Sequence, residues 1–76
     1  MDPVTKGERA SNTLDSEVYI EAVEGARGQI KHEWTQAKGQ IEREALWHKY
    51  QAIDAVTTAL RILRDRGIQE RKKQEK

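Results

Sequence analysis

The sequence predicts an all-α protein, an antiparallel helical hairpin that self-associates into a helical bundle. Three observations predict this fold. Apolar residues recur at spacings of three and four along two long stretches, which is the period of an α-helix. Alternation of apolar and polar residues, the mark of a half-buried strand, is not sustained anywhere in the chain. The 76 residues include only one Pro and five Gly, so few positions interrupt a helix.

Residues 1–13 are expected to form either a short helix or a loose N-terminal arm. Asp2 precedes Pro3, and Pro suits the first helical position because the N–H that it lacks would be unpaired there anyway. The remaining residues are mostly polar, and chain ends tend to fray. This segment precedes a predicted hairpin domain of residues 14–67 and a charged tail of residues 68–76.

The first long helix is predicted near residues 16–37. Asp15 is expected to be its N-cap, and Glu17 lies in the first turn, where the helix dipole favours a carboxylate. One apolar face follows at helical spacing: Tyr19, Val23, Ala26, Ile30, Trp34 and Ala37. Gly25 and Gly28 weaken a helix by roughly 1 kcal/mol each relative to Ala. They are either tolerated flexible points or places where another backbone approaches closely.

Residues 35–40 form the only candidate turn between the two apolar stretches. Gly39 is expected to end the first helix with a left-handed cap. The alternative is one continuous long helix, because no strong N-cap residue opens the second stretch. A hairpin is favoured because a single rod of two amphipathic halves cannot cover its own apolar face.

The second helix, predicted near residues 41–66, carries the clearest pattern. Lys49 is the one polar member of a heptad-like row that otherwise contains Leu46, Ile53, Val56, Leu60 and Leu63. A second row widens the apolar stripe: Ile41, Ala45, Ala52, Ala55, Ala59 and Ile62. A stripe of this width suits a helix that touches two neighbours in a bundle. Gly67 is expected to end the helix, since Gly often follows the last helical turn.

A single copy has little material for a core. The chain contains fourteen Val, Ile and Leu and no Phe, and a lone core in so short a chain seldom supplies more than a few kcal/mol. The absence of Cys excludes disulfides and thiolate zinc sites. Stability is therefore expected from well-formed helices and from association with a second copy or with another protein.

Charge is distributed unevenly along the chain. Residues 1–33 hold four basic and seven acidic side chains, whereas residues 34–76 hold ten basic and six acidic ones. An antiparallel hairpin places an acidic helix beside a basic one. Exposed ion pairs are individually weak, so the asymmetry is expected to select the orientation of a pairing more than to stabilise it.

Several classes of function are excluded by missing motifs. No nucleophile motif, Gly-rich phosphate loop or cofactor fingerprint occurs, so we expect neither an enzyme nor a cofactor. His32 and Glu33 begin the zinc-protease pattern H-E-x-x-H, but Gln36 stands where the second His is required. No apolar run approaches the roughly 18 residues of a membrane span, and no signal-peptide pattern opens the chain. We expect a cytoplasmic protein that binds no small-molecule substrate.

Protein–protein interaction is the predicted function. Trp34 and Trp47 can approach each other across a turn near Gly39, either as ordinary core residues or as anchors for a partner, since Trp is enriched at interface hot spots. The apolar row and the two indoles together form the predicted interface: Trp34, Leu46, Trp47, Ile53, Val56, Leu60 and Leu63.

The C-terminal end supports a second hypothesis, nucleic-acid binding. Its basic side chains could neutralise phosphates: Arg61, Arg64, Arg66, Arg71, Lys72 and Lys73. Interleaved acidic residues, a net charge of only +1 and the lack of nearby base-stacking aromatics disfavour this hypothesis.

The element Arg-Glu-x-Leu-Trp at residues 43–47 is the most distinctive part of a pattern that spans roughly residues 9–67. The other members are Arg9, Ala10, Leu14, Asp15, Val18, Ala22, Val23, Ile30, Trp34, Ala52, Ile53, Val56, Leu60 and Gly67. This pattern resembles a set of short helical proteins encoded by tailed bacteriophages. The resemblance implies a virion-associated or head-assembly protein, found in the host cytoplasm or the virion, and it transfers no catalytic residues. A phage-encoded inhibitor that docks on a host protein through Trp34 or Trp47 is the third hypothesis.

Overall fold

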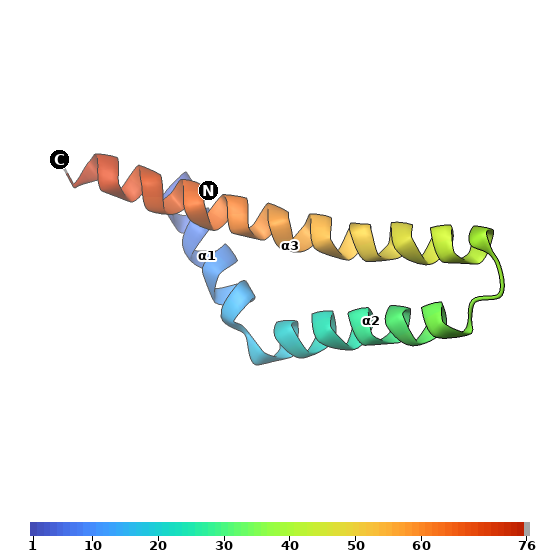
Figure 1. Cartoon of the computed structure of the whole chain (residues 1–76). Helices are drawn as coiled ribbons and strands as arrows, with labels where there is room; N and C mark the ends of the chain where they lie inside the picture. The colour runs from blue at the N-terminus through green and yellow to red at the C-terminus, as the bar shows by residue number, and fades with distance from the viewer. Residues whose placement is uncertain (76) are drawn as a thin grey trace.

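The computed structural model describes residues 1–75, and they form three α-helices. The helices are α1 (Pro3–Asp15), α2 (Glu17–Gln36) and α3 (Gln40–Gln74). The prediction of an all-α protein is confirmed. The molecule is elongated, with principal extents of 57 × 23 × 17 Å, and α3 runs along its whole length (Figure 1).

Of the two alternatives for the N-terminal segment, the structure has the helix. Asp2 is the N-cap of α1, where its carboxylate accepts a hydrogen bond from the Thr5 backbone N–H at 2.8 Å, and Pro3 opens the first turn. The helix continues to Asp15, so the prediction that Asp15 caps the second helix is wrong. Ser16 takes that role, because it has extended backbone between the two helices and its Oγ accepts from the Tyr19 N–H at 3.4 Å.

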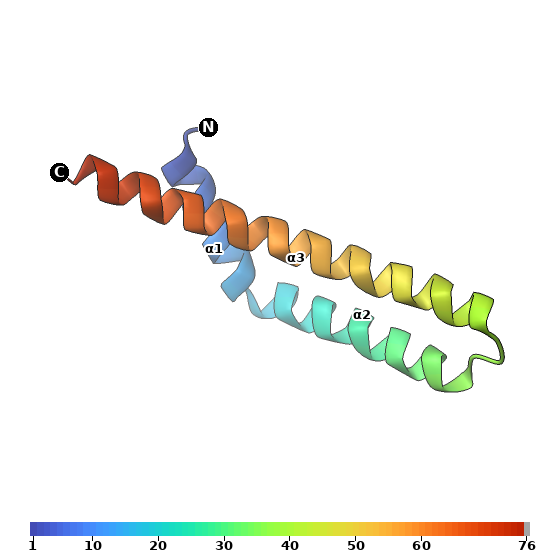
Figure 2. The same cartoon turned by 45° about the horizontal axis from the view of Figure 1, so that its top comes forward.

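The chain turns at residues 37–39, and α3 runs back along α2 in the antiparallel direction (Figures 1 and 2). The helix α2 ends at Gln36, and Gly39 lies at the N-cap of α3 with φ of −153°. The prediction that Gly39 ends the first helix in a left-handed conformation is therefore wrong. Its backbone is extended, a conformation that any residue adopts.

The helix α3 is longer than predicted, because Gly67 lies in its interior. It continues to Gln74, so most of the predicted charged tail is helical, while Lys76 lies outside the described residues. The helix α1 crosses α3 near the C-terminal end of α3 (Figure 2), and Gly67 is buried against Gly7 of α1. A Cβ added to Gly7 would lie 2.7 Å from the Gly67 Cα, so the two backbones touch. The prediction that Gly67 ends the helix is therefore wrong, and its lack of a side chain instead allows α1 to pack against α3.

The side of α3 that faces the rest of the chain follows a strict alternation of four and three residues. Its buried and half-buried members are Leu46, Tyr50, Ile53, Thr57, Leu60, Arg64 and Gly67. The predicted row and this seam have Leu46, Ile53 and Leu60 in common. The predicted row also contains Val56 and Leu63, which lie beside the seam and are 59% and 36% exposed. Thr57 is accommodated in the seam because the Tyr19 hydroxyl hydrogen-bonds its Oγ1 at 3.0 Å.

Candidate protein interface

The structure distributes the seven predicted interface residues over three environments. Leu46 is 7% exposed, and Ile53 and Leu60 are half-buried, all within the seam of α3. Trp34 and Trp47 remain 42% and 51% exposed. The exposed Val56 and Leu63 lie away from the two indoles. Only four of the seven side chains therefore offer substantial surface to a second molecule.

Both indoles lie on one apolar groove between α2 and α3. We call it the aromatic groove; it has a volume of about 390 Å³, and its lining residues are Ile30, Lys31, Trp34, Thr35, Leu46, Trp47 and Tyr50. The rings of Trp47 and Tyr50 stack with their centroids 6.2 Å apart and their planes at 5°. Ile30 and Leu46 form a buried floor, so an apolar side chain entering the groove would contact apolar atoms.

Polar contacts hold α2 against α3 beside the groove. The Arg27 guanidinium pairs with the Asp54 carboxylate at 2.5 Å and lies 5.8 Å from the centre of the Tyr50 ring. Asp54 and Tyr50 are four residues apart on α3, so one guanidinium bridges both. Tyr50 was absent from the predicted interface, although its position three residues after Trp47 places it on the same side of the helix.

A second apolar surface lies on the opposite side of the hairpin. Trp47 and Lys49 are about 160° apart around α3 at 3.6 residues per turn, and Lys49 lines a separate groove with Glu33, Gln36, Ala37, Glu42, Ala45 and Leu46. Continuing along α3 from that groove is a surface that we call the alanine face: Ala45, Ala52, Ala55, Val56, Ala59 and Leu63. The hairpin therefore exposes apolar side chains on both of its sides.

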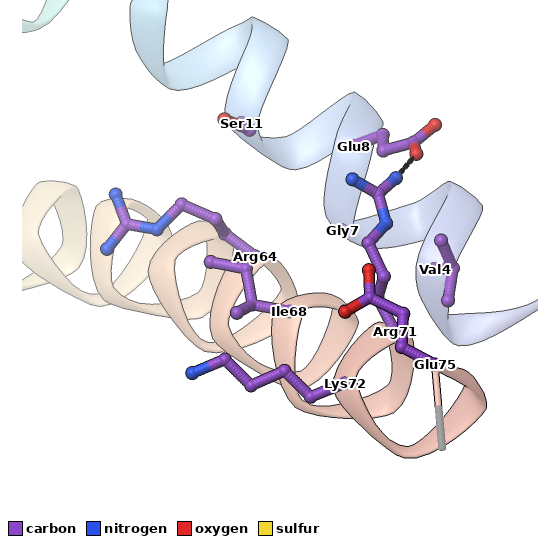
Figure 3. Close-up of a pocket in the computed structure, with 10 residues that line it drawn as sticks. Val4, Gly7, Glu8, Ser11, Arg64, Ile68, Arg71, Lys72 and Glu75 are labelled. Carbon is purple, nitrogen blue, oxygen red and sulfur yellow. Dashed lines mark hydrogen bonds and ion pairs between the residues drawn. The ribbon is translucent and has the colours of Figure 1, made fainter.

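The structure brings three of the six predicted nucleic-acid residues, Arg64, Arg71 and Lys72, to one hollow between α1 and α3. Arg71 pairs with Glu8 of α1, as Figure 3 shows, and Arg64 pairs with its neighbour Asp65 at 3.1 Å. Arg61 and Arg66 lie about 140° apart around α3. The hollow is lined by both acidic and basic side chains, among them Glu8, Arg71 and Glu75. The cations of this hollow therefore lie among acidic side chains, which lowers the net positive charge that phosphate groups would meet.

Among residues 1–75, no three His, Cys, Asp or Glu side chains converge as the ligands of a metal ion would. No helix within these residues is both long enough and apolar enough to cross a membrane.

Comparisons with known proteins give no match. The sequence matches no protein-family model and no curated protein, and no solved structure matches the chain.

Proposed function

We propose that this chain is a non-enzymatic assembly or adaptor protein that buries its exposed apolar side chains against another protein chain, most simply a second copy of itself. The observation that carries the proposal is an excess of accessible surface. The chain exposes 6027 Å², whereas a compact monomer of this mass exposes about 4,800 Å². The difference of about 1,200 Å² exceeds the roughly 800 Å² that each partner buries in a standard interface.

The shape of the molecule supports the same proposal. Its radius of gyration is 16.6 Å, compared with about 11 Å for a compact domain of this length. Among the described residues, no large side chain is less than 2% exposed. A helical layer of this kind lacks a second layer over its apolar side chains, and a partner chain could supply one.

Two exposed apolar surfaces suit an adaptor better than one. The aromatic groove and the alanine face lie on opposite sides of the α2–α3 hairpin, so occupation of one leaves the other accessible. Aromatic side chains dominate interface energetics, which makes the aromatic groove the stronger candidate for a specific contact.

The resemblance to short phage-encoded proteins supports a more specific role, as a component of a bacteriophage virion or of head assembly. Mass spectrometry of purified particles of a phage that encodes the chain tests this role. The chain is expected in the particles or in assembly intermediates. Its absence from both would contradict a structural role in the virion.

Sedimentation velocity over a wide range of protein concentrations tests self-association. The sedimentation coefficient is expected to rise with concentration as a monomer converts to a dimer or a larger oligomer. A fully helical monomer at every concentration, with no change in the exposure of the indoles, would contradict self-association. Leu60→Asp is expected to lower both helicity and association, because Leu60 belongs to the seam within the chain.

A further inference from the structure

We propose that two copies of this chain pair antiparallel along α2, so that Ile20 of each copy inserts into the aromatic groove of the other. This inference rests on the proposed function, since it names the partner of the exposed aromatic surface. Three features of α2 support the pairing: an exposed row of residues, the order of charges along that row, and the open space at Gly28.

One edge of α2 carries a row with alternating spacings of three and four residues: Glu17, Ile20, Glu24, Arg27, Lys31 and Trp34. Residues at this spacing share one side of a helix. Lys31 and Trp34 line the aromatic groove, so the groove lies at one end of the row. Ile20, which is 41% exposed, lies near the other end, about 21 Å away along the helix.

The charges along this row change sign at its middle. Glu17 and Glu24 precede the middle of the row, and Arg27 and Lys31 follow it. A two-fold axis reverses the order of residues, so the same patch must complement itself. An acidic half followed by a basic half meets this condition in the antiparallel arrangement and opposes it in the parallel one.

The spacing matches the arrangement in detail. Glu24 and Lys31 lie equally far on either side of the bond between residues 27 and 28. A two-fold axis at that bond places the Glu24 carboxylate of each copy opposite the Lys31 ammonium group of the other. The same axis brings Ile20 opposite the indole end of the partner helix, where Trp34 and Trp47 are half-exposed.

Next to the row, one position after Arg27, Gly28 leaves room for a second helix. Gly28 lies beside the axis, and a Cβ added there would meet no atom within 4 Å. The absence of a side chain at this position allows another backbone to approach closely. The excess surface of about 1,200 Å² per chain is also enough for a stable dimer.

Charge exchange tests the pairing directly. Glu24→Lys and Lys31→Glu each create two like-charged contacts per dimer, and each is expected to raise the dimer dissociation constant about tenfold. The double variant restores opposite charges and is expected to return within a few-fold of the wild type. Lys73→Glu, the same change on the last turn of α3, is the control and is expected to leave the constant unchanged. If the double variant is no tighter than either single variant, the antiparallel pairing is wrong.

Cysteine trapping gives a second readout, because the chain has no native Cys. Glu24→Cys with Lys31→Cys places two thiols seven residues, or about 10.5 Å, apart on one helix, too far for a disulfide within the chain. Mild oxidation is expected to give a covalent dimer. The matched control is Ala45→Cys with Ala52→Cys, which has the same separation on the alanine face and is expected to remain monomeric under denaturing conditions.

The outcomes separate this inference from the proposed function. Trapping of the control pair alone would overturn the α2 pairing and place self-association on the alanine face. A monomer at every concentration in sedimentation velocity would overturn both self-association and the pairing. Trapping of the Glu24 and Lys31 positions, together with rescue by charge exchange, supports both.

Discussion

The two places where α3 meets the rest of the chain are built differently. At the crossing with α1, Gly7 and Gly67 bring the two backbones into contact. Along α2, long side chains bridge the helices, through Tyr19 to Thr57 and through the ion pair of Arg27. Small residues close an interface within the chain, whereas long bridging side chains leave grooves on both sides of the hairpin. The aromatic groove therefore lies along α2, while the hollow at the α1 crossing has both acidic and basic side chains in its lining.

The glycines of this chain show the same contrast. Gly7 and Gly67 are buried, and a Cβ on either would collide with backbone atoms. Gly25 and Gly28 are exposed, with no atom within 4 Å of an added Cβ. Within a single copy, then, close backbone approach occurs at the first pair and not at the second.

Gly67→Ala is expected to have the largest effect on stability. The added methyl group would lie 2.8 Å from the Gly7 Cα and 3.0 Å from the Pro3 carbonyl oxygen, so α1 must move away. We expect a net loss of about 2 kcal/mol in the free energy of unfolding, even after the gain in helix propensity. Urea unfolding followed by circular dichroism at a fixed protein concentration measures it. An unchanged midpoint would show that the crossing is looser than described.

Tyr19→Phe is expected to lower the free energy of unfolding by about 1 kcal/mol, because it removes the hydrogen bond to Thr57, a residue that is 5% exposed. Thermal unfolding of this variant compared with the wild type gives the difference. The double variant with Thr57→Val removes both polar groups and should recover part of the loss. If Tyr19→Phe alone is neutral, this hydrogen bond does not determine how α2 is held.

Gly25→Ala is expected to raise the free energy of unfolding by roughly 0.5–1 kcal/mol, the opposite direction from Gly67→Ala. The methyl group meets open space, and the substitution improves helix propensity while reducing the freedom of the unfolded chain. The two variants carry the same chemical change, so each is the control for the other in one set of urea titrations. A loss of stability in Gly25→Ala would mean that this side of α2 is already covered.

The smallest expected effect concerns the start of α1. The Thr5 backbone N–H, and then the Thr5 hydroxyl, donate to the Asp2 carboxylate and hold its pKa below the ordinary value of 3.8. The contribution of this cap to stability is thus complete above the pKa that Asp2 has in the unfolded chain. It is lost as pH falls through the lowered pKa that Asp2 has in the folded chain. Hydrogen exchange of the Thr5 amide should accelerate in acid relative to the unfolded chain. Asp2→Asn, which retains a capping oxygen but does not titrate, should abolish this pH dependence.

Local signals predicted the helices well, and their failures have one cause. The Asp2–Pro3 start of α1 and the apolar spacing of the two longer helices depend on residues close in sequence. The prediction that Gly67 ends the helix was wrong, because the neighbouring sequence does not distinguish a glycine that ends a helix from one that lets a second helix pack closely. Its partner, Gly7, lies sixty residues away, and only the fold brings the two together.

The candidate interface shows the same division. The sequence identified Trp34 and Trp47 as exceptional, but not that Tyr50 stacks on one of them or that Ile30 and Leu46 form the groove floor. It also could not distinguish two rows on α3, one continuing through Val56 and Leu63 and the other through Thr57 and Arg64. Both rows include Leu46, Ile53 and Leu60, so apolar periodicity alone does not choose between them.

The sequence by itself determined the all-α fold class, the position of the turn and the reversal of charge along α2. Each of these depends on residues within a few helical turns of one another. The tertiary structure decided which side of α3 is covered, which glycines touch and which apolar residues remain exposed. These choices follow from the packing of α1 and α2 on one long helix. The physical reason is that burial depends on the neighbour a side chain meets, and that neighbour is set by the fold.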